Sequence, residues 1–213
     1  MEFSAQTDIS QSNHFIPPLE LVKDELVKVK ELINEQLIFS SEDKKRKSDI
    51  DNLLVSIRTR SGKMIRPGLV LLTGKCFDRI TDEHINVAAC IEMVHHATLL
   101  HDDVIDEGIQ RRGKPTINTL WGNESAVLLG DFLLSHVFKL SSKSNPKVTK
   151  VIADAAVRLC EGELRQIMQK DNWQLSEPEY ISVITEKSAV LFSSSCYLGA
   201  VLAKADEEKA NLR

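Results

Sequence analysis

Apolar residues recur at steps of three and four along most of this chain. The first such series consists of Leu19, Val22, Leu26, Val29, Ile33 and Leu37. This spacing puts the side chains on one face of an α-helix, so it predicts an amphipathic helix packed against a core. A second series from Ile50 to Ile57 predicts another helix, and we expect the charged stretch 41–47 between them to be a solvated connection.

Helix start signals divide the rest of the chain. Pro67 and Pro146 suit the first turn of a helix, where a missing N–H costs nothing. Ser176 is followed by acidic residues, which favour a helix N-terminus. The patterns predict a basic loop at 108–115 and helices over 67–77, 81–104, 123–140, 146–170 and 176–205. We therefore expect an all-α fold with about eight to ten helices of ordinary length.

Composition narrows the class of protein. The 213 residues include 27 Lys and Arg against 31 Asp and Glu, a formal net charge of −4 that excludes a globally basic nucleic-acid binder. Nine glycines and six prolines are few for a fold of many turn-linked strands. Residues 1–18 are polar, and we expect a mobile arm there, followed by one helical domain over 19–213.

The chain carries no obvious targeting signal. Its N-terminus lacks the basic-then-apolar order of a signal peptide, and no apolar run reaches the roughly 18 residues of a membrane span. The four cysteines form no Cys-x-x-Cys pair, and we expect them to be reduced. We therefore expect a cytoplasmic protein without an integral membrane segment.

The most distinctive segment is the acidic end of the helix predicted over 81–104. Asp102 and Asp106 are four positions apart, so on a helix they project from the same side, one turn apart. Stacked carboxylates repel one another, whereas Mg²⁺ takes oxygen ligands and is commonly shared with substrate phosphates. The alternative is an acidic last turn that faces water, although acidic residues are unfavourable there.

Two clusters of cations flank this segment. Arg111 and Arg112 are either surface ion pairs, which contribute little, or bidentate clamps for a phosphate. Gly62, Lys63 and Arg66 lie at an expected helix N-terminus, where amide groups and the helix dipole favour an anion. Such a combination of glycine and cations is more often only a turn with solvated charges. The sequence therefore leaves both the turn and the anion site open.

Two further polar residues are ambiguous by themselves. His95 lies two helical turns before Asp102 on nearly the same face, but a lone histidine is more often a satisfied core residue. Lys187 is explained equally well as a solvated cation.

Taken together, these segments resemble the trans-isoprenyl diphosphate synthase, or polyprenyl synthetase, family. The matching stretches keep the family's order and are 61–67, 92–106, 111–116, 130–133, 162–166 and 186–189. The resemblance covers about residues 19–205. It implies an isoprenoid synthase-type bundle of antiparallel helices around a central cavity.

The resemblance also implies a role for each residue. Mg²⁺, holding the diphosphate of an allylic prenyl substrate, would be bound by Asp102 and Asp106 with support from Asp103. Isopentenyl diphosphate would be bound by Gly62, Lys63, Arg66, His95 and Arg112. The allylic diphosphate would also be bound by Arg111, Gln166 and Lys187. In the family reaction the allylic C–O bond ionises, the isopentenyl double bond attacks the cation, and loss of a proton leaves a longer all-trans chain.

This sequence departs from the family pattern in two places. Ser61 and Met64 stand where the first basic motif usually has Gly and Arg, which removes one cation. The second Asp-rich motif of the family, which holds a further Mg²⁺, does not occur before Arg213. The chain is therefore either a fragment of a synthase or a naturally short member. In both cases we expect a bundle that is incomplete at its C-terminus and a chain that is inactive or nearly so by itself.

Product length depends, in the family, on the residues one and two turns before the aspartates. Ala97 and Thr98 are small at this place, where short-chain enzymes often carry an aromatic floor. An open tunnel would favour a medium or long product, with Phe132 or His136 on a facing helix as a lower floor. The alternative, that Ala97 is only a close helix–helix contact, is equally consistent with the sequence.

Three functions compete. A prenyltransferase, expected as a homodimer, explains both the acidic and the basic clusters. A non-catalytic short subunit that pairs with a complete synthase would not need three clustered acids. A class I terpene cyclase would not need Lys63, Arg66 and His95 for a second diphosphate.

Overall fold

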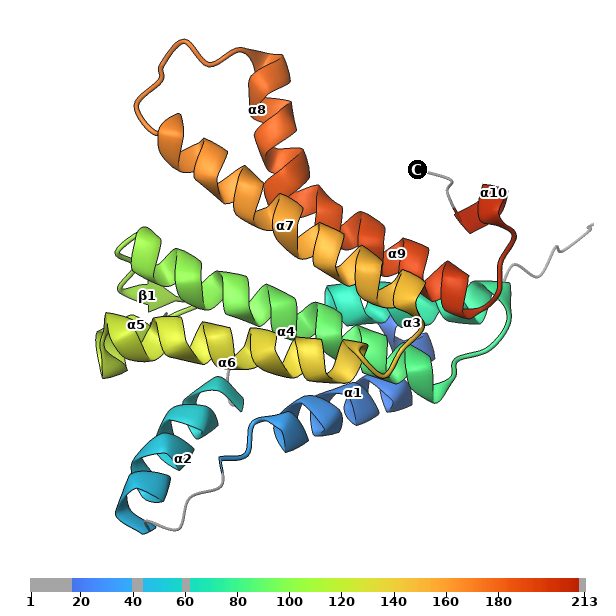
Figure 1. Ribbon diagram of the computed structural model, residues 1–213, viewed down its shortest axis with the longest axis horizontal. Coiled ribbons are helices and arrows are strands. Elements are labelled where there is room, and N and C mark those ends of the chain that lie inside the picture. Colours follow the sequence, from blue (N-terminus) through green and yellow to red (C-terminus); the bar gives the residue numbers. More distant parts are fainter. Residues whose placement is uncertain (1–16, 40–43, 59–61, 211–213) are drawn as a thin grey trace, which may run out of the picture.

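The computed structural model describes residues 17–39, 44–58 and 62–210. Nearly all of the regular structure there is helical (Figure 1). The elements are a 3₁₀ helix Pro18–Val22, α1 Lys23–Gln36, α2 Lys44–Arg58, α3 Ile65–Phe77, α4 Asp82–Ile105, α5 Ile117–Trp121, α6 Asn123–Ser141, α7 Pro146–Met168, α8 Glu177–Ile184, a π-helix Thr185–Ala189, α9 Val190–Leu202 and α10 Glu207–Ala210. Two-residue strands, β1 Gln110–Arg111 and β2 Lys114–Pro115, pair antiparallel. The expected all-α class is confirmed.

Capping residues in the sequence predicted the starts of several helices correctly. The Asn145 side chain accepts a hydrogen bond from the Lys147 amide in front of α7, and Pro146 is the first residue of that helix. Thr81 and Ser176 both form capping boxes, at the starts of α4 and α8. A capping box satisfies amide groups that a helix start would otherwise leave unpaired. These boundaries agree with the sequence because caps are interactions between near neighbours.

Other boundaries differ from the expectation. The stretch 41–47 is not a connection throughout, because α2 begins at Lys44; residues 41–43 lie outside the described part. α3 begins at Ile65, two residues before Pro67, after Met64 adopts a left-handed φ of 54°. The basic loop contains the β1–β2 ribbon, and the short helix α5 follows it unpredicted. The proposed mobile arm lies outside the described residues, apart from 17 and 18.

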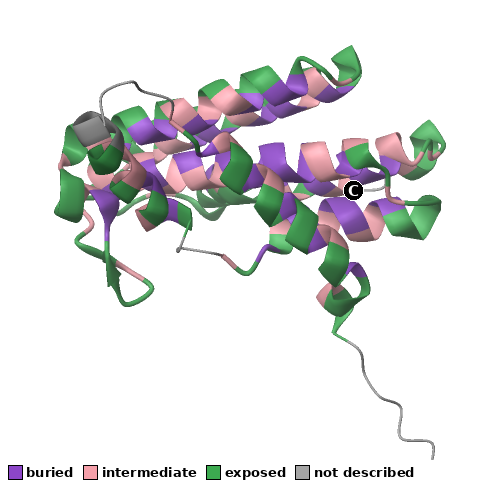
Figure 2. Ribbon diagram, turned by 90° about the horizontal axis from the view of Figure 1, so that it is seen from below, coloured by how far each residue is buried: buried purple, intermediate pink, exposed green. Residues whose placement is uncertain are grey.

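Helix α4 runs through the middle of the molecule, with α1, α3, α6 and α9 packed around it (Figure 1). Eight consecutive residues of α4, 87–94, are buried. A helix that is buried on most of its circumference is a core helix, which explains why its apolar positions show little periodicity. Figure 2 shows the buried positions gathered along the inward sides of the surrounding helices.

α9 and α3 approach each other unusually closely. A Cβ atom on Gly199 would lie 2.3 Å from the carbonyl oxygen of Val70, so only glycine fits there.

In the part of the chain that is described, no helix is both long enough and apolar enough to cross a membrane.

Candidate active site

A cavity of about 320 Å³ opens between the start of α3, the middle and C-terminal part of α4, and the β1–β2 ribbon. Its wall is rich in cationic side chains, namely Lys63, Arg66, Arg111, Arg112 and Lys114. Gly62, His95, His96, Glu92 and Asp103 also line it, together with apolar residues such as Leu99 and Ile117. We call this the basic cavity. It brings together all five residues expected to bind isopentenyl diphosphate.

The electrostatics of the basic cavity follow from burial. Desolvation and the nearby Arg66 charge lower the pKa of His95 to about 4, so its imidazole is neutral at pH 7. Burial also lowers the pKa of the Arg66 guanidinium, while Glu92 opposes that shift. The Arg66 guanidinium lies 4.3 Å from the ring centroid of Phe192 on α9, a cation–π contact that fixes one of its faces.

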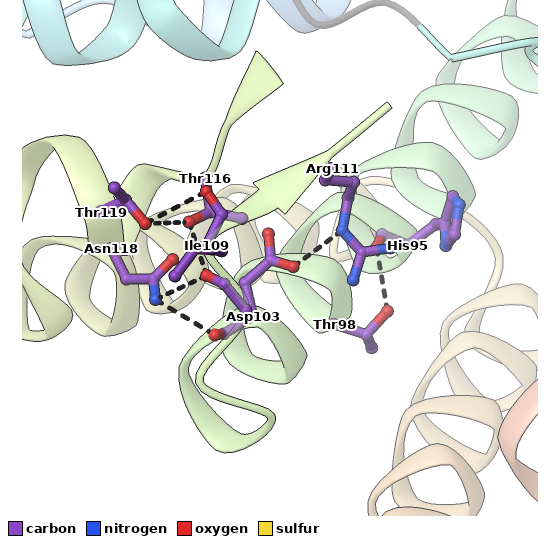
Figure 3. A network of polar contacts seen from close by, with 9 residues as sticks. His95, Thr98, Asp103, Ile109, Arg111, Thr116, Asn118 and Thr119 are labelled. Atoms are coloured by element: carbon purple, nitrogen blue, oxygen red, sulfur yellow. Dashed lines mark hydrogen bonds and ion pairs between the residues drawn. The ribbon is translucent and has the colours of Figure 1, made fainter. Parts of the chain in front are cut away.

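The β1–β2 ribbon is tied to the end of α4 and positions two arginines. Arg111 Nε donates to Asp103 Oδ1 at 2.8 Å (Figure 3). The Asn118 amide donates at 3.1 Å to the carbonyl oxygens of both Asp103 and Gly108. Arg112 has a left-handed φ of 54°, which belongs to the tight turn between the strands. The expected basic loop is therefore tied to the end of α4 through Arg111, and α5, which follows the loop, is tied there through Asn118.

A second group of charged residues, outside the basic cavity, includes Asp102 and Asp106 at the end of α4. Burial and the nearby Glu163 raise the pKa of Asp102 to about 6, Asp106 adds to this shift, and Lys187 and Arg111 oppose it. We call Asp102, Asp106 and Glu163 of α7 the carboxylate cluster. Nearby cations do not fully compensate the negative charge of this cluster, and its donors are all oxygens. A hard divalent cation prefers such a site.

The described side chains do not themselves complete a metal site. No three His, Cys, Asp or Glu residues among them are close enough together to hold an ion. Asp103, expected to support the metal, is buried and pairs with Arg111 in the basic cavity. Asp102 and Asp106 would therefore share a cation with substrate oxygens and water, which suits Mg²⁺.

Lys187 reaches the carboxylate cluster from a π-helix. Its Nζ lies 2.6 Å from Glu163 Oε2, and the adjacent Glu186 pairs with Arg165 at 3.1 Å. The close approach of the π-helix to α7 requires Gly162, because a Cβ there would lie 2.8 Å from the Lys187 amide nitrogen. Single π-helical turns inside helices are frequent at functional sites. Gln166 lies one turn after Glu163 on α7 and is half-buried.

The residues proposed to set chain length, Ala97, Thr98 and Phe132, do not line the basic cavity. Ala97 is fully buried and is not among the residues that line the basic cavity. Thr98 Oγ1 donates to the carbonyl oxygen of His95 at 2.9 Å. The Phe132 ring packs edge-on against His136, with centroids 4.6 Å apart. Their role in chain length stays a prediction.

Sequence reasoning gave no role to two acidic residues of the site. Glu92 is only 2% exposed, in the wall of the basic cavity. Glu163 pairs with Lys187, and its charge helps to raise the pKa of Asp102. Both lie inside matching stretches, and a charged residue within the apolar run of α4 was a signal for Glu92. Nothing local marked Glu163, since its partners lie on other elements.

Comparison with known proteins identifies the relatives. A model of the polyprenyl synthetase family matches residues 47–213. The chain belongs to the polyprenyl synthetase family. A heptaprenyl diphosphate synthase component 2 of Bacillus subtilis is 40% identical over 148 residues, covering 69% of this chain and 42% of that protein. An octaprenyl diphosphate synthase of Escherichia coli is 37% identical over 161 residues, covering 75% and 50%.

Solved structures of synthases have the same fold. A decaprenyl diphosphate synthase from Rhodobacter capsulatus superposes with a TM-score of 0.83 at 36% identity, covering 91% of this chain and 58% of that one. A polyprenyl synthase from Caulobacter crescentus, complexed with calcium and isoprenyl diphosphate, also gives 0.83 at 31% identity, covering 91% and 57%. The resemblance drawn from the motifs is confirmed. The chain spans about half the length of the curated relatives it matches.

Proposed function

We propose that this chain carries the isopentenyl diphosphate site and the first metal site of a Mg²⁺-dependent prenyltransferase. The enzyme would condense isopentenyl diphosphate with an allylic prenyl diphosphate to give a longer all-trans polyprenyl diphosphate. The observation that carries the proposal is the basic cavity lying next to the carboxylate cluster, with Asp103 and Asp102 as neighbours on α4. The basic cavity suits a diphosphate directly, and the carboxylate cluster suits a diphosphate that is bound through a metal cation.

The chain's residues would perform distinct tasks. Lys63, Arg66 and Arg112 would bind the isopentenyl diphosphate by charge-assisted hydrogen bonds. Neutral His95 would add a hydrogen bond without a further charge. Asp102 and Asp106 would hold Mg²⁺, which when bound neutralises the charge of the leaving diphosphate. Lys187 would bind the same diphosphate, and Glu163 keeps its ammonium group in place.

The reaction needs both substrates fixed and water excluded. The allylic C–O bond breaks and the diphosphate leaves with its electron pair. The isopentenyl double bond then forms the new C–C bond with the allylic cation, and one proton is lost. Apolar wall residues such as Leu99 and Ile117 would keep water from the cation.

We further propose a medium or long product, formed by a cytoplasmic homodimer. Small residues at Ala97 and Thr98 support a long product, because a bulky floor one turn before Asp102 is absent from the sequence. Ala97→Phe should shorten the product of the active enzyme. An unchanged product distribution would favour a simple helix–helix contact at Ala97. Light scattering after size exclusion measures the oligomeric state.

The test of the function is incorporation of labelled isopentenyl diphosphate with farnesyl diphosphate and Mg²⁺, followed by product sizing. This chain and the product of its whole gene would be assayed side by side. Because the chain spans about half the length of its curated relatives, we expect turnover by the whole gene product and little by the 213 residues alone. Turnover by neither would favour the non-catalytic subunit.

A further inference from the structure

Two arginines of the basic cavity are held in different ways. Arg111 Nε donates to Asp103 Oδ1 at 2.8 Å, so one of its N–H groups is already used. Arg66 is instead stacked on a ring, because its guanidinium carbon lies 4.3 Å from the ring centroid of Phe192. Arg66 Nε is buried and has no hydrogen-bond partner among the described residues. The stacked ring therefore limits how the Arg66 guanidinium can turn.

A stacked guanidinium keeps its capacity to donate hydrogen bonds. The ring covers a face of the planar group, whereas the N–H donors point outward in its plane. A carboxylate would also fix the group, but it would use donors and compensate the positive charge, as Asp103 does for Arg111. A neutral ring does neither, and it does not repel an anion. Phe192 therefore suits an arginine whose N–H groups are kept for a ligand.

Phe192 reaches Arg66 from behind the cavity wall. Arg66 lines the basic cavity, whereas Phe192 is half-buried near the start of α9 and is not among the described residues that line it. α9 packs against α3, and the two helices lie side by side in Figure 1. Gly199, two helical turns after Phe192, permits this approach, since a Cβ there would lie 2.3 Å from the Val70 carbonyl oxygen. The position of the ring is therefore fixed by helix packing.

Partial burial strengthens the contact between the ring and the cation. Loss of hydration lowers the pKa of the Arg66 guanidinium, while the charge of Glu92 opposes that shift. A partly desolvated cation gains more from the face of an aromatic ring than an exposed one does.

We propose that Phe192 is a positioning residue, whose ring holds the Arg66 guanidinium by a cation–π contact and leaves its N–H groups free for a diphosphate. The inference rests on the proposed isopentenyl diphosphate site. An arginine side chain loses conformational freedom when it binds an anion, and stacking it in advance reduces that loss. α9 directly follows the π-helix of Lys187, so one continuous helical segment would serve both diphosphates.

The sharpest test changes the electrostatics of the ring and keeps its shape. In this chain Phe192 would be replaced by 4-fluoro-, 3,5-difluoro- and 3,4,5-trifluorophenylalanine, which withdraw electron density from the ring face at nearly constant volume. Titration calorimetry without divalent metal, at fixed salt, measures the affinity for isopentenyl diphosphate. We expect the dissociation constant to rise with each added fluorine, by about threefold over the whole series. In an Arg66→Met background, the same series should leave the weaker binding unchanged.

Ordinary substitutions supply a second readout. Phe192→Leu removes the ring and should weaken binding about fivefold, whereas Phe192→Tyr keeps an aromatic face and should retain most of the affinity. Phe138→Leu replaces an exposed phenylalanine of α6 and should leave binding unchanged. The ¹⁵N–¹H resonance of Arg66 Nε should be sharp in the ligand-free wild type and broadened in Phe192→Leu.

Two results would overturn the role of Phe192. One is a dissociation constant that does not change along the fluorinated series, which would make the ring simple core packing. The other is an equal rise along the series in the Arg66→Met background. If Phe192→Leu does not fold, the fluorinated variants still test the inference, because they keep the ring.

Failure of the proposed site gives a different result. If wild type does not bind isopentenyl diphosphate, or if Arg66→Met binds as wild type does, the diphosphate site itself is wrong and the inference falls with it. If Arg66→Met binds more weakly while the fluorinated series has no effect, the site stands and only the role of Phe192 is wrong.

Discussion

The basic cavity and the carboxylate cluster lie on neighbouring parts of α4 but manage their charges in opposite ways. In the basic cavity five Lys and Arg residues face two carboxylates, Glu92 and Asp103. Around the carboxylate cluster each described cation is paired, Lys187 with Glu163 and Arg165 with Glu186. Burial, followed by the charges of Glu163 and Asp106, nevertheless raises the pKa of Asp102 to about 6.

The difference shows how one helix can serve two partners of opposite charge. The cavity carries surplus positive charge and suits an anion directly. The cluster carries surplus negative charge and suits a divalent cation, which then brings an anion with it. Asp102 and Asp103 are adjacent, so their side chains leave the helix about 100° apart and belong to different groups. Arg111 lies between the two, since it pairs with Asp103 and also lowers the pKa of Asp102.

The largest effect should come from removing the cation site. Asp102→Asn is expected to lower turnover of the whole gene product by about 10²–10³-fold, because the leaving diphosphate loses charge stabilisation. Isopentenyl diphosphate incorporation measures it, with Asp171→Asn, an exposed position, as the matched control. Metal-free binding of isopentenyl diphosphate should be unchanged in the same variant. Loss of that binding as well would mean that the two regions are not separate.

Removing a cation from the basic cavity should have the next largest effect. Arg112→Gln is expected to weaken isopentenyl diphosphate binding by about 10–100-fold, since a charge-assisted bond to the diphosphate is lost. Calorimetry measures the affinity, which should also fall with rising salt. Lys28→Met, on the exposed side of α1, serves as the control. Equal losses in both variants would indicate only a long-range effect of net charge.

The approach of the π-helix to α7 can be tested through stability. Gly162→Ala would place a Cβ 2.8 Å from the Lys187 nitrogen and 2.9 Å from the Glu186 Cβ. We expect a loss of about 1–3 kcal/mol in the free energy of unfolding, because backbone has to move. Urea denaturation measures it. Gly108→Ala, whose nearest contacts would be an ordinary 3.5 Å, should change stability much less.

The smallest expected effect is a pH dependence of the metal-free fold. The pKa of Asp102 rises from its usual 3.8 to about 6, so its contribution to stability is present below pH 4 and is lost as pH rises through 6. Asp102→Asn should therefore melt a few degrees higher than wild type at pH 7.5, from about 1 kcal/mol after solvent screening. The difference should vanish at pH 4.

With added Mg²⁺ at pH 7.5, wild type should instead melt at a higher temperature than Asp102→Asn. A cation that binds only the folded wild type raises its melting temperature by mass action, and the Asn variant lacks a ligand. Differential scanning fluorimetry with and without chelator measures both conditions. A variant that melts with wild type under all of them would contradict the proposed surplus of negative charge.

Much of the fold could be predicted from short stretches of sequence. Thr81 and Ser176 each bind a side chain three residues ahead, and Asn145 binds an amide two residues ahead, so these helix starts depend on near neighbours alone. The unpredicted helix α5 follows the β1–β2 ribbon, and the Asn118 side chain on it bonds to carbonyls of residues 103 and 108. Those bonds need the ribbon to fold back on α4, which no local pattern indicates.

The sequence by itself determined the class of fold, the family and five of the residues that meet in the basic cavity. It could do so because helix periodicity and helix caps act within a few positions, and because the motifs are themselves contiguous. Only the tertiary structure decided which charges lie together. Glu92 of α4 and Arg66 of α3 line the same cavity, and Phe192 of α9 covers the Arg66 guanidinium. Glu163 of α7 pairs with Lys187 where Gly162 lets the π-helix approach. These partners come from different helices, so packing alone determines which carboxylate positions which cation.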